Sequence, residues 1–377
     1  MQSQRLQSLD FFRGITVMAM ILVNNPGSWD SVYSPLRHAQ WNGCTPTDLV
    51  FPFFLFIMGV SIHFAYKSKK EAGLTRAAAI KILKRAAIIF LLGIFLAWFT
   101  LPLSKMFDFD RLATLRIPGV LQRISIVFLC SALIYLKSGW LGQIRIAASL
   151  LIAYYILMTW VPVPDFGPAN LEPGTNLAAW LDRLLLDGHL WAQSKTWDPE
   201  GPLSTMPAIA TGLLGILTGQ LFDEIKNPAE RVSWIFFIGG ILILLGLSWD
   251  IAFPINKSVW TSSYVLYSGG LAMQALAASH WLIDIQQRQS WTKPFLYFGM
   301  NAIFAYVISG VLAKILLRIQ LTGGSGETEP LWQYLYQNLY ASWLTPKVAS
   351  LLFALTFVGF FYVILRGMFH RKIFIKV

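Results

Sequence analysis

The residues best suited to chemistry lie between the first two apolar segments of the chain. His38 stands in the run Arg-His-Ala-Gln-Trp-Asn-Gly at positions 37–43, with Asn24 before it and Asp48 after it. An imidazole titrates near pH ~6.5, so His38 can take a proton from an attacking amine or hydroxyl at neutral pH. The side-chain amide of Asn24 can donate hydrogen bonds to a developing oxyanion. This stretch therefore combines a base with polar donors.

The spacing of these residues leaves a structural interpretation open. In that interpretation His38 closes a loop, while Asn24 and Asp48 cap the helices on either side of it. Cys44 lies near His38 in the sequence, but nothing indicates the lowered thiol pKa that a Cys-His nucleophile needs. Cys44 and Cys130 lie in different environments and form no framework of disulfides or metal ligands, so no metal site is predicted.

Two carboxylates, Asp198 and Glu200, stand in the run Trp-Asp-Pro-Glu-Gly at positions 197–201, just before an apolar segment. They either attract a cationic substrate amine or place negative charge at a helix N-terminus. Both remain candidates for substrate binding.

Ionisable and polar residues also occur inside apolar segments, where a charge near the bilayer centre costs at least about 2.5 kcal/mol. Asp10 and Arg13 are three residues apart and can pair on one face of a helix. Arg123 either forms hydrogen bonds in the bundle interior or reaches a phosphate or carbonyl group of a ligand. Asn301 and Tyr264 add hydrogen-bonding capacity that also fits contacts between helices.

Composition shows which elements must position these residues. Hydrophobic residues make up 55% of the 377 residues and charged ones only 13%, against about 25% charged residues in soluble domains. A helix needs about 20 apolar residues to cross a bilayer. Such segments lie at 8–25, 47–66, 80–100, 117–136, 144–162, 203–221, 232–249, 259–283, 294–317 and 348–366. We therefore predict an all-α, polytopic bundle of about ten transmembrane helices, in one domain that spans residues 1–377.

The distribution of basic residues predicts the orientation of this bundle. The net charge is +11, but Lys and Arg gather after the second segment and in the C-terminal tail, whereas the 22–46 connection holds only Arg37. The positive-inside rule then places both termini in the cytoplasm and the long loops 22–46, 163–202 and 319–347 outside. A short amphipathic helix is predicted at 176–186. The basic excess thus indicates a lipid bilayer as partner and no nucleic acid.

Several blocks of this sequence resemble the family of lysosomal heparan-alpha-glucosaminide N-acetyltransferase and its bacterial relatives, and they follow one another over nearly the whole chain. The blocks are Arg5–Gly14, Val23–Asn24, His38–Gly43, Asp48–Pro52, Arg116–Arg123, Asp182–Leu186, Asp198–Gly201, Asn256–Lys257 with Trp260, Ser263–Val265, Gly299–Asn301 and Arg371–Phe374.

The resemblance implies that His38 is the catalytic histidine and Asn24 its polar partner. It also implies that acetyl-CoA enters from the cytoplasm as acetyl donor and that an amino sugar of the glucosamine type accepts the acetyl group outside. On this basis the expected substrate-binding residues are Trp41, Asp48, Asp198 and Glu200. The expected contacts with acetyl-CoA are Arg13, Gln122, Arg123, Tyr264 and Asn301.

The chain departs from the lysosomal enzyme at its N-terminus, because it begins at the first core helix without the luminal domain. This favours a bacterial amino-sugar enzyme of the inner membrane. Two mechanisms stay open, direct transfer with His38 as base and an acetyl-His38 intermediate. A secondary transporter for an amino sugar or a small acidic solute remains the alternative function, and homodimerisation is an open question.

Overall fold

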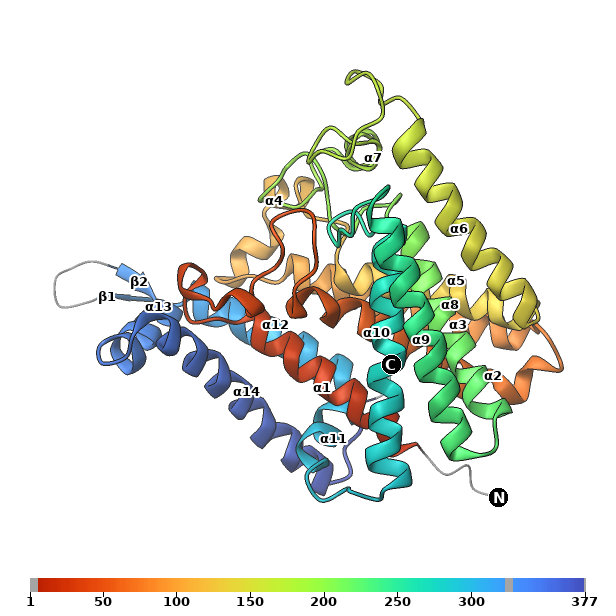
Figure 1. The fold of residues 1–377 in the computed structure, drawn as a ribbon. Coiled ribbons are helices and arrows are strands. Elements are labelled where there is room, and N and C mark those ends of the chain that lie inside the picture. The colour runs from red at the N-terminus through yellow and green to blue at the C-terminus, as the bar shows by residue number, and fades with distance from the viewer. Residues whose placement is uncertain (1–5, 323–327, 376–377) are drawn as a thin grey trace.

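The computed structural model describes residues 6–322 and 328–375 and consists mainly of helices (Figure 1). The long helices are α1 (Gln7–Asn24), α2 (Val50–Lys70), α3 (Arg76–Trp98), α5 (Val120–Lys137), α6 (Trp140–Trp160), α8 (Thr205–Glu224), α9 (Pro228–Asp250), α10 (Ser262–His280), α12 (Ala302–Arg318) and α14 (Pro346–His370). The shorter elements are α4 (Phe109–Ala113), α7 (Leu177–Leu186), α11 (Lys293–Met300), α13 (Leu331–Tyr336) and the antiparallel strands β1 (Gln320–Thr322) and β2 (Thr328–Pro330). The all-α prediction is confirmed.

The predicted number of membrane spans is confirmed only in part. Within the described residues, six helical segments are long and apolar enough to cross a membrane, and a seventh is obtained if α11 and α12 form one broken span. The six are Pro46–Lys70, Val120–Lys137, Trp140–Trp160, Thr205–Glu224, Pro228–Asp250 and Pro346–His370. Helices α1, α3 and α10 lie where spans were predicted, but α1 and α3 carry charged residues and α10 is rich in serine and glycine.

The segment 294–317, predicted as one helix, is broken at Asn301. Helices α11 and α12 meet there at an angle of 83°. The Asn301 side chain accepts a hydrogen bond from the Ile375 N–H at 2.9 Å and donates one to the Ile373 carbonyl at 3.2 Å. Because asparagine readily bonds to main-chain groups, it favours the end of a helix over its interior. The break thus lets the C-terminal tail pack against the bundle.

Glycine contacts bring the central helices together. A Cβ atom on Gly59 of α2 would lie 2.1 Å from the Gly212 carbonyl oxygen of α8, and one on Gly14 of α1 would lie 1.8 Å from the Phe295 carbonyl oxygen of α11. Such close backbone contact is typical of helices that pack through small residues in membranes. It fixes α1 and α2, which carry the two ends of the loop around His38.

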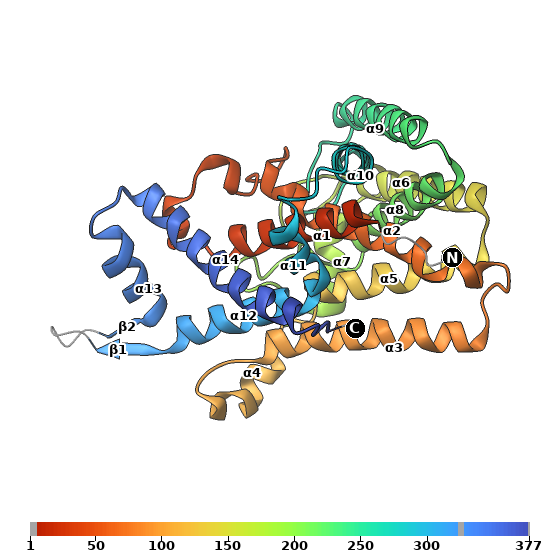
Figure 2. The same ribbon diagram turned by 90° about the horizontal axis from the view of Figure 1, so that it is seen from below.

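The helices form layers, with α2, α5 and α8 between the α9–α10 pair on one side and α3 on the other (Figure 2). Of the most apolar 18-residue stretch of each helix, 67% is buried in α8 but only 17% in α9. The face of α9 that is exposed in this chain is therefore available to lipid, as expected for a helix at the edge of a bundle.

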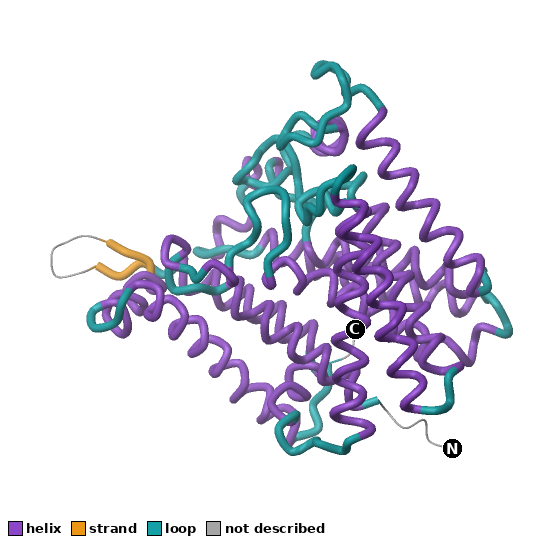
Figure 3. Tube along the Cα trace, viewed as in Figure 1, coloured by secondary structure: helices purple, strands orange, loops and turns teal. Residues whose placement is uncertain are grey.

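Much of the loop structure gathers at the α7 end of the molecule, whereas the strands β1 and β2 lie apart from it (Figure 3). Trp41 donates its indole N–H to the Leu171 carbonyl at 3.0 Å, and Gly43 donates its N–H to the Ile255 carbonyl at 2.7 Å. Three segments far apart in sequence are thus joined: the α1–α2 loop, the loop around α7 and the α9–α10 connection. Helix α7 confirms the short helix predicted at 176–186.

The two ends of the described chain lie on the same side of the bundle. Gln7, at the start of α1, lines one cavity together with Phe369 and Lys372 at the end of α14. This agrees with the prediction that both termini lie on one side of a membrane. Which side they face stays a prediction.

Candidate active site

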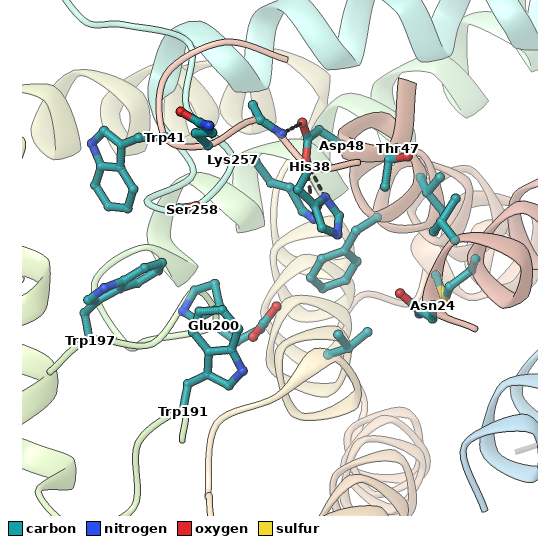
Figure 4. Close-up of a pocket in the computed structure, with 18 of the residues that line it drawn as sticks. Asn24, His38, Trp41, Thr47, Asp48, Trp191, Trp197, Glu200, Lys257 and Ser258 are labelled. Atoms are coloured by element: carbon teal, nitrogen blue, oxygen red, sulfur yellow. Dashed lines mark hydrogen bonds and ion pairs between the residues drawn. The ribbon is translucent and has the colours of Figure 1, made fainter. Parts of the chain in front are cut away.

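A cavity of about 400 Å³ lies where the three loops meet, and we call it the outer cavity (Figure 4). Five of the residues predicted for catalysis or substrate binding line it together: Asn24, His38, Trp41, Asp48 and Glu200. They come from the end of α1, the α1–α2 loop, the 3-10 turn that precedes α2 and the loop before α8. The structure therefore collects in one place side chains that are spread over 177 positions of the sequence, from 24 to 200.

His38 and Asp48 form the centre of the outer cavity. The His38 side chain is 46% exposed, whereas that of Asp48 is 1% exposed. Nδ1 of His38 lies 2.6 Å from Oδ1 of Asp48, and Oδ2 of Asp48 accepts the N–H groups of Ala39 and Thr45, each at 3.0 Å. The carboxylate is thus held on several sides and orients the imidazole through Nδ1. Within the described part of the chain Nε2 has no hydrogen-bond partner, so it is free for a substrate.

The local sequence explains why the loop ends in this geometry. Thr45 and Asp48 form a capping box around the 3-10 turn Pro46–Leu49, which leads directly into α2. Tyr264, predicted as a contact for acetyl-CoA, instead donates its hydroxyl hydrogen to the main-chain carbonyl of Asp48. Asp48 is therefore both a helix cap and the partner of His38, so the structural interpretation and the catalytic one apply to the same residue.

Asn24 is the last residue of α1 and lies exposed in the outer cavity. Its neighbour Asn25 is buried and donates to the Ile21 carbonyl at 2.7 Å, which satisfies that part of the helix end. Among the described residues, none forms a hydrogen bond with the Asn24 amide. The amide is therefore available to an oxygen atom of a ligand.

Lys257, in the α9–α10 connection, is a residue of the outer cavity for which the sequence predicted no role. Its Nζ lies 3.0 Å from Nδ1 of His38 and 3.6 Å from Oδ1 of Asp48. Burial lowers the pKa of Lys257 below its usual value, although the charges of Asp48 and Glu200 oppose this shift. Lys257 is 219 positions away from His38 in the sequence, and only the contact between their loops brings them together.

Arg116 binds both carboxylates that were predicted to attract a substrate amine. Its guanidinium donates to Asp198 at 2.7 and 2.8 Å and to Glu200 at 2.6 Å. The Asp198 side chain is 0% exposed and lies outside the cavity wall. A direct substrate contact of Asp198 is therefore not supported, because Arg116 covers it, whereas Glu200 does line the cavity. The sequence block at 116–123 contained Arg116, but no role for it was predicted.

Three tryptophans form one wall of the outer cavity (Figure 4). The ring centroids of Trp41 and Trp197 are 5.2 Å apart, and those of Trp191 and Trp197 are 5.7 Å apart. Both pairs meet edge to face, which is a favourable arrangement of aromatic rings. Only Trp41 was predicted as a binding residue. Trp191 and Trp197 enlarge that single contact to a continuous aromatic surface.

A second cavity, of about 290 Å³, lies deeper between α1, α2, α3, α5 and the α11–α12 break, and we call it the inner cavity. Arg13, predicted to contact acetyl-CoA, lines it and donates to Asp10 at 3.0 Å and to Ser61 at 2.7 Å. Arg85 also lines it, and its guanidinium lies 4.9 Å from the ring centroid of Phe128. The Nε atom of Arg85 is buried without a hydrogen-bond partner in the described chain.

Comparison with known proteins adds a family relationship to this geometry. A family model described as a domain of unknown function (DUF5009) matches residues 5–143. The chain is 30% identical to heparan-alpha-glucosaminide N-acetyltransferase of Homo sapiens and 29% identical to the protein of that name of Mus musculus, and each alignment covers 93% of this chain. Over nearly its whole length the chain is therefore similar to these N-acetyltransferases. It spans about 60% of the length of the two curated relatives, 59% and 60% respectively.

Two residues predicted to contact acetyl-CoA belong to the protein interior. Arg123 is fully buried, donates to the Gly201 carbonyl and the Ser204 hydroxyl, and faces the Trp260 ring at 5.2 Å. Gln122 fills the space left by glycines at 93 and 119. Neither lines the inner cavity. For Arg123 the structure favours the interior hydrogen-bonding role that the sequence had left open.

Asn301 lies beside the inner cavity rather than in its wall. Its amide binds main-chain groups of Ile373 and Ile375, and Ile375 in turn lines the cavity. A direct contact of this amide with acetyl-CoA is therefore not supported, because both ends of the amide are already bonded.

Cys44 is not placed as a nucleophile, because it does not line the outer cavity. Burial raises the pKa of its thiol to about 12, and the nearby charge of Asp48 adds to this effect. The thiolate, the reactive form, is therefore scarce at neutral pH. Both its position and its raised pKa argue against a Cys-His nucleophile in the outer cavity.

Proposed function

We propose that this chain is a transmembrane acetyltransferase that moves the acetyl group of cytoplasmic acetyl-CoA to the amine of a glucosamine-type sugar on the outer face. The observation that carries this proposal is the pair of cavities on shared helices. The outer cavity holds a histidine with its carboxylate, and the inner cavity holds two guanidinium groups. Supporting it, the two curated relatives carry the name of an N-acetyltransferase.

The two cavities follow each other along α2, α5 and α12. On α5 the outer cavity ends at Val120 and the inner one begins at Ile124, which are about 6 Å apart along the helix axis. On α12 the corresponding residues are Tyr306 and Ile303. A thioester can reach the outer cavity only through the protein, since the lipid core excludes polar groups. These shared helix faces offer the shortest route.

The inner cavity fits the charge of the acetyl donor. Acetyl-CoA carries phosphate groups, and guanidinium groups bind phosphate through charge-assisted hydrogen bonds. The unpartnered Nε of Arg85 is a donor that such a group would satisfy. We therefore assign Arg85 and Arg13 to donor binding, in place of Gln122, Arg123 and Asn301.

The outer cavity fits the chemistry of acetyl transfer to an amine. As the amine nitrogen bonds to the acetyl carbon and the carbon–sulfur bond breaks, Nε2 of His38 accepts the proton that the amine loses. Asp48 holds the ring for this step through Nδ1. The Asn24 amide donates to the carbonyl oxygen while that oxygen carries negative charge, and coenzyme A leaves as its thiolate.

The aromatic wall fits a sugar as acceptor. Trp41, Trp191 and Trp197 offer flat apolar surfaces beside the polar groups of His38 and Glu200, the combination that binding sites for small polar molecules use. We further propose that the chain is a single domain in a bacterial inner membrane, with both termini in the cytoplasm, and that the bilayer and an amino sugar are its partners. A homodimer belongs to the same proposal.

The test measures acetyl transfer across the membrane of sealed vesicles that contain the purified protein in known orientation. Acetyl-CoA is supplied on the side of the termini and a panel of amino sugars on the other side. We expect release of coenzyme A that depends on the amino sugar, with one acetylated sugar formed per coenzyme A. Solute flux without acetyl transfer would overturn the proposal in favour of a transporter. Acetylation of His38 without sugar would replace direct transfer by the two-step mechanism.

A further inference from the structure

The Nδ1 atom of His38 lies within hydrogen-bond distance of two groups, and it cannot bond to both of them at one time. Oδ1 of Asp48 lies 2.6 Å from it and Nζ of Lys257 lies 3.0 Å from it. A neutral imidazole carries a hydrogen on only one of its two nitrogens. Nδ1 can therefore donate to the carboxylate or accept from an ammonium group, but it cannot do both. The two contacts correspond to two different tautomers of the ring.

The two tautomers differ in what His38 can do to a substrate. If Nδ1 carries the hydrogen and donates it to Asp48, the lone pair is on Nε2, which can then act as a base. If Lys257 as an ammonium donates to Nδ1, the hydrogen is on Nε2, which can then only donate. Lys257 also forms an ion pair with Oδ1 of Asp48 at 3.6 Å, and an ammonium group has three N–H donors, so it can hold this carboxylate and still donate to Nδ1.

The surroundings of Lys257 determine how readily it loses its proton. The Lys257 side chain is 22% exposed. The charged and titratable groups that face it are Asp48 from the start of α2, Glu200 from the loop before α8, His38 and Cys44. Burial lowers the pKa of Lys257 and the two carboxylates oppose the shift. Glu200 is already paired with Arg116 at 2.6 Å, which weakens its hold on Lys257.

We propose that Lys257 is a positioning residue whose charge selects the tautomer of His38. Charged Lys257 places the hydrogen on Nε2 and blocks proton abstraction. Neutral Lys257 leaves Nδ1–H to Asp48 and frees Nε2 as the base. This inference rests on the proposed function, because it gives His38 the role of base. It makes the protonation of one lysine a switch for acetyl transfer.

Two substitutions of Lys257 separate this role from a merely structural one. Lys257→Arg keeps a positive charge at every accessible pH, so we expect its turnover to fall by at least about 10²-fold, toward the roughly 10⁴-fold loss seen when a catalytic histidine is held in the wrong tautomer. Lys257→Met removes the charge, and we expect it to exceed the wild type at acid pH and to lose only the part of the rise of kcat with pH that deprotonation of Lys257 causes, while the part due to the base His38 remains. Lys105→Arg, at an exposed position, controls for the substitution itself.

A direct readout of the tautomer is independent of activity. Nitrogen-15 NMR of histidine-labelled protein distinguishes the two ring nitrogens of His38, and His38→Gln identifies its signals. In the pH range where the imidazole ring is neutral, we expect hydrogen on Nδ1 in Lys257→Met, hydrogen on Nε2 in Lys257→Arg, and a change between them in the wild type. Equal pH profiles and equal tautomers in the arginine and methionine variants would overturn the inference. Failure of the proposed function is distinguishable, since the wild type would then show no acetyl transfer, or His38→Gln would retain it.

Discussion

The outer and inner cavities share α2, α5 and α12, but the charges in them are compensated differently. In the outer cavity, Arg116 is paired with two carboxylates and Asp48 is bonded to its neighbours on several sides. In the inner cavity, Arg13 has partners, whereas Arg85 keeps a buried N–H without one in the described chain. Paired charges suit proton transfer, because each pair holds its side chains in place and adds no net charge to the cavity. An unsatisfied cationic donor suits an incoming anion.

The largest expected effect concerns the outer cavity. We expect His38→Ala to lower turnover by roughly 10²- to 10⁴-fold, because the base is lost. Binding of acetyl-CoA, measured by titration calorimetry on the purified protein, should stay within error of the wild type, since His38 does not line the inner cavity.

His189 offers a matched control for this substitution. It lies in the loop after α7, and its Nδ1 is bound to the Leu115 carbonyl at 2.7 Å. His189→Ala should therefore leave turnover nearly unchanged. Near-normal turnover in His38→Ala would remove the distinction between the cavities, because the outer one would then hold no reacting group.

The next effect concerns the inner cavity. We expect Arg85→Met to raise KM for acetyl-CoA by about 10- to 100-fold, the range that corresponds to one lost hydrogen bond to a charged group, while KM for the sugar stays unchanged. Steady-state kinetics with each substrate varied in turn measures both. The control is Lys84→Met, next in sequence but exposed. An equal rise in KM for the sugar would contradict the assignment of separate sites.

The same contrast shows what the sequence could predict. Apolar segments located the helices to within a few residues, because a span must be long and apolar wherever it lies. The candidate site in the α1–α2 loop could be predicted from the sequence. His38, Trp41 and Asp48 are close in sequence, and their side chains are of types that serve catalysis and binding. Membrane orientation also follows from composition, although it stays a prediction.

Long-range contacts were beyond reach of the sequence. Lys257 reaches His38 only because the α9–α10 connection pairs with the α1–α2 loop at Gly43. Arg85 looks like the other basic residues of α3 until the fold shows that it is turned inward. For Arg123 the sequence left two roles open, because a polar group in an apolar segment serves either a ligand or another helix. Periodicity does not distinguish these cases.

A smaller effect is expected at the aromatic wall of the outer cavity. Trp191→Ala removes one ring from the wall and its edge-to-face contact with Trp197. We expect KM for the amino sugar to rise by about 3- to 10-fold, as for the loss of one aromatic contact, with little change in KM for acetyl-CoA. Trp343, which is 69% exposed, provides the control as Trp343→Ala. A selective change in the KM for acetyl-CoA would reverse the assignment of donor and acceptor to the two cavities.

Asp182→Asn in α7 is expected to have the smallest effect on activity. Its main effect should be on stability, because Asp182 is buried against the main chain of Asp198. Burial raises the pKa of Asp182 to about 7. The hydrogen bond that the Asp198 N–H donates to Oδ2 of Asp182, at 2.9 Å, opposes this shift. In the unfolded chain an aspartate has a pKa of about 3.9. Between these values the folded protein holds a proton that the unfolded chain releases, so the free energy of unfolding must fall as pH rises from about 4 to 7 and stay reduced above that range.

Asparagine cannot ionise, so Asp182→Asn should lose this slope and melt at a higher temperature than the wild type at pH 8, measured by thermal unfolding in detergent across the pH range. Because Asp182 does not line the inner cavity, the stabilisation by added coenzyme A should be equal in both proteins. An unchanged slope would show that the proton is held elsewhere and that the outer region does not depend on this buried acid.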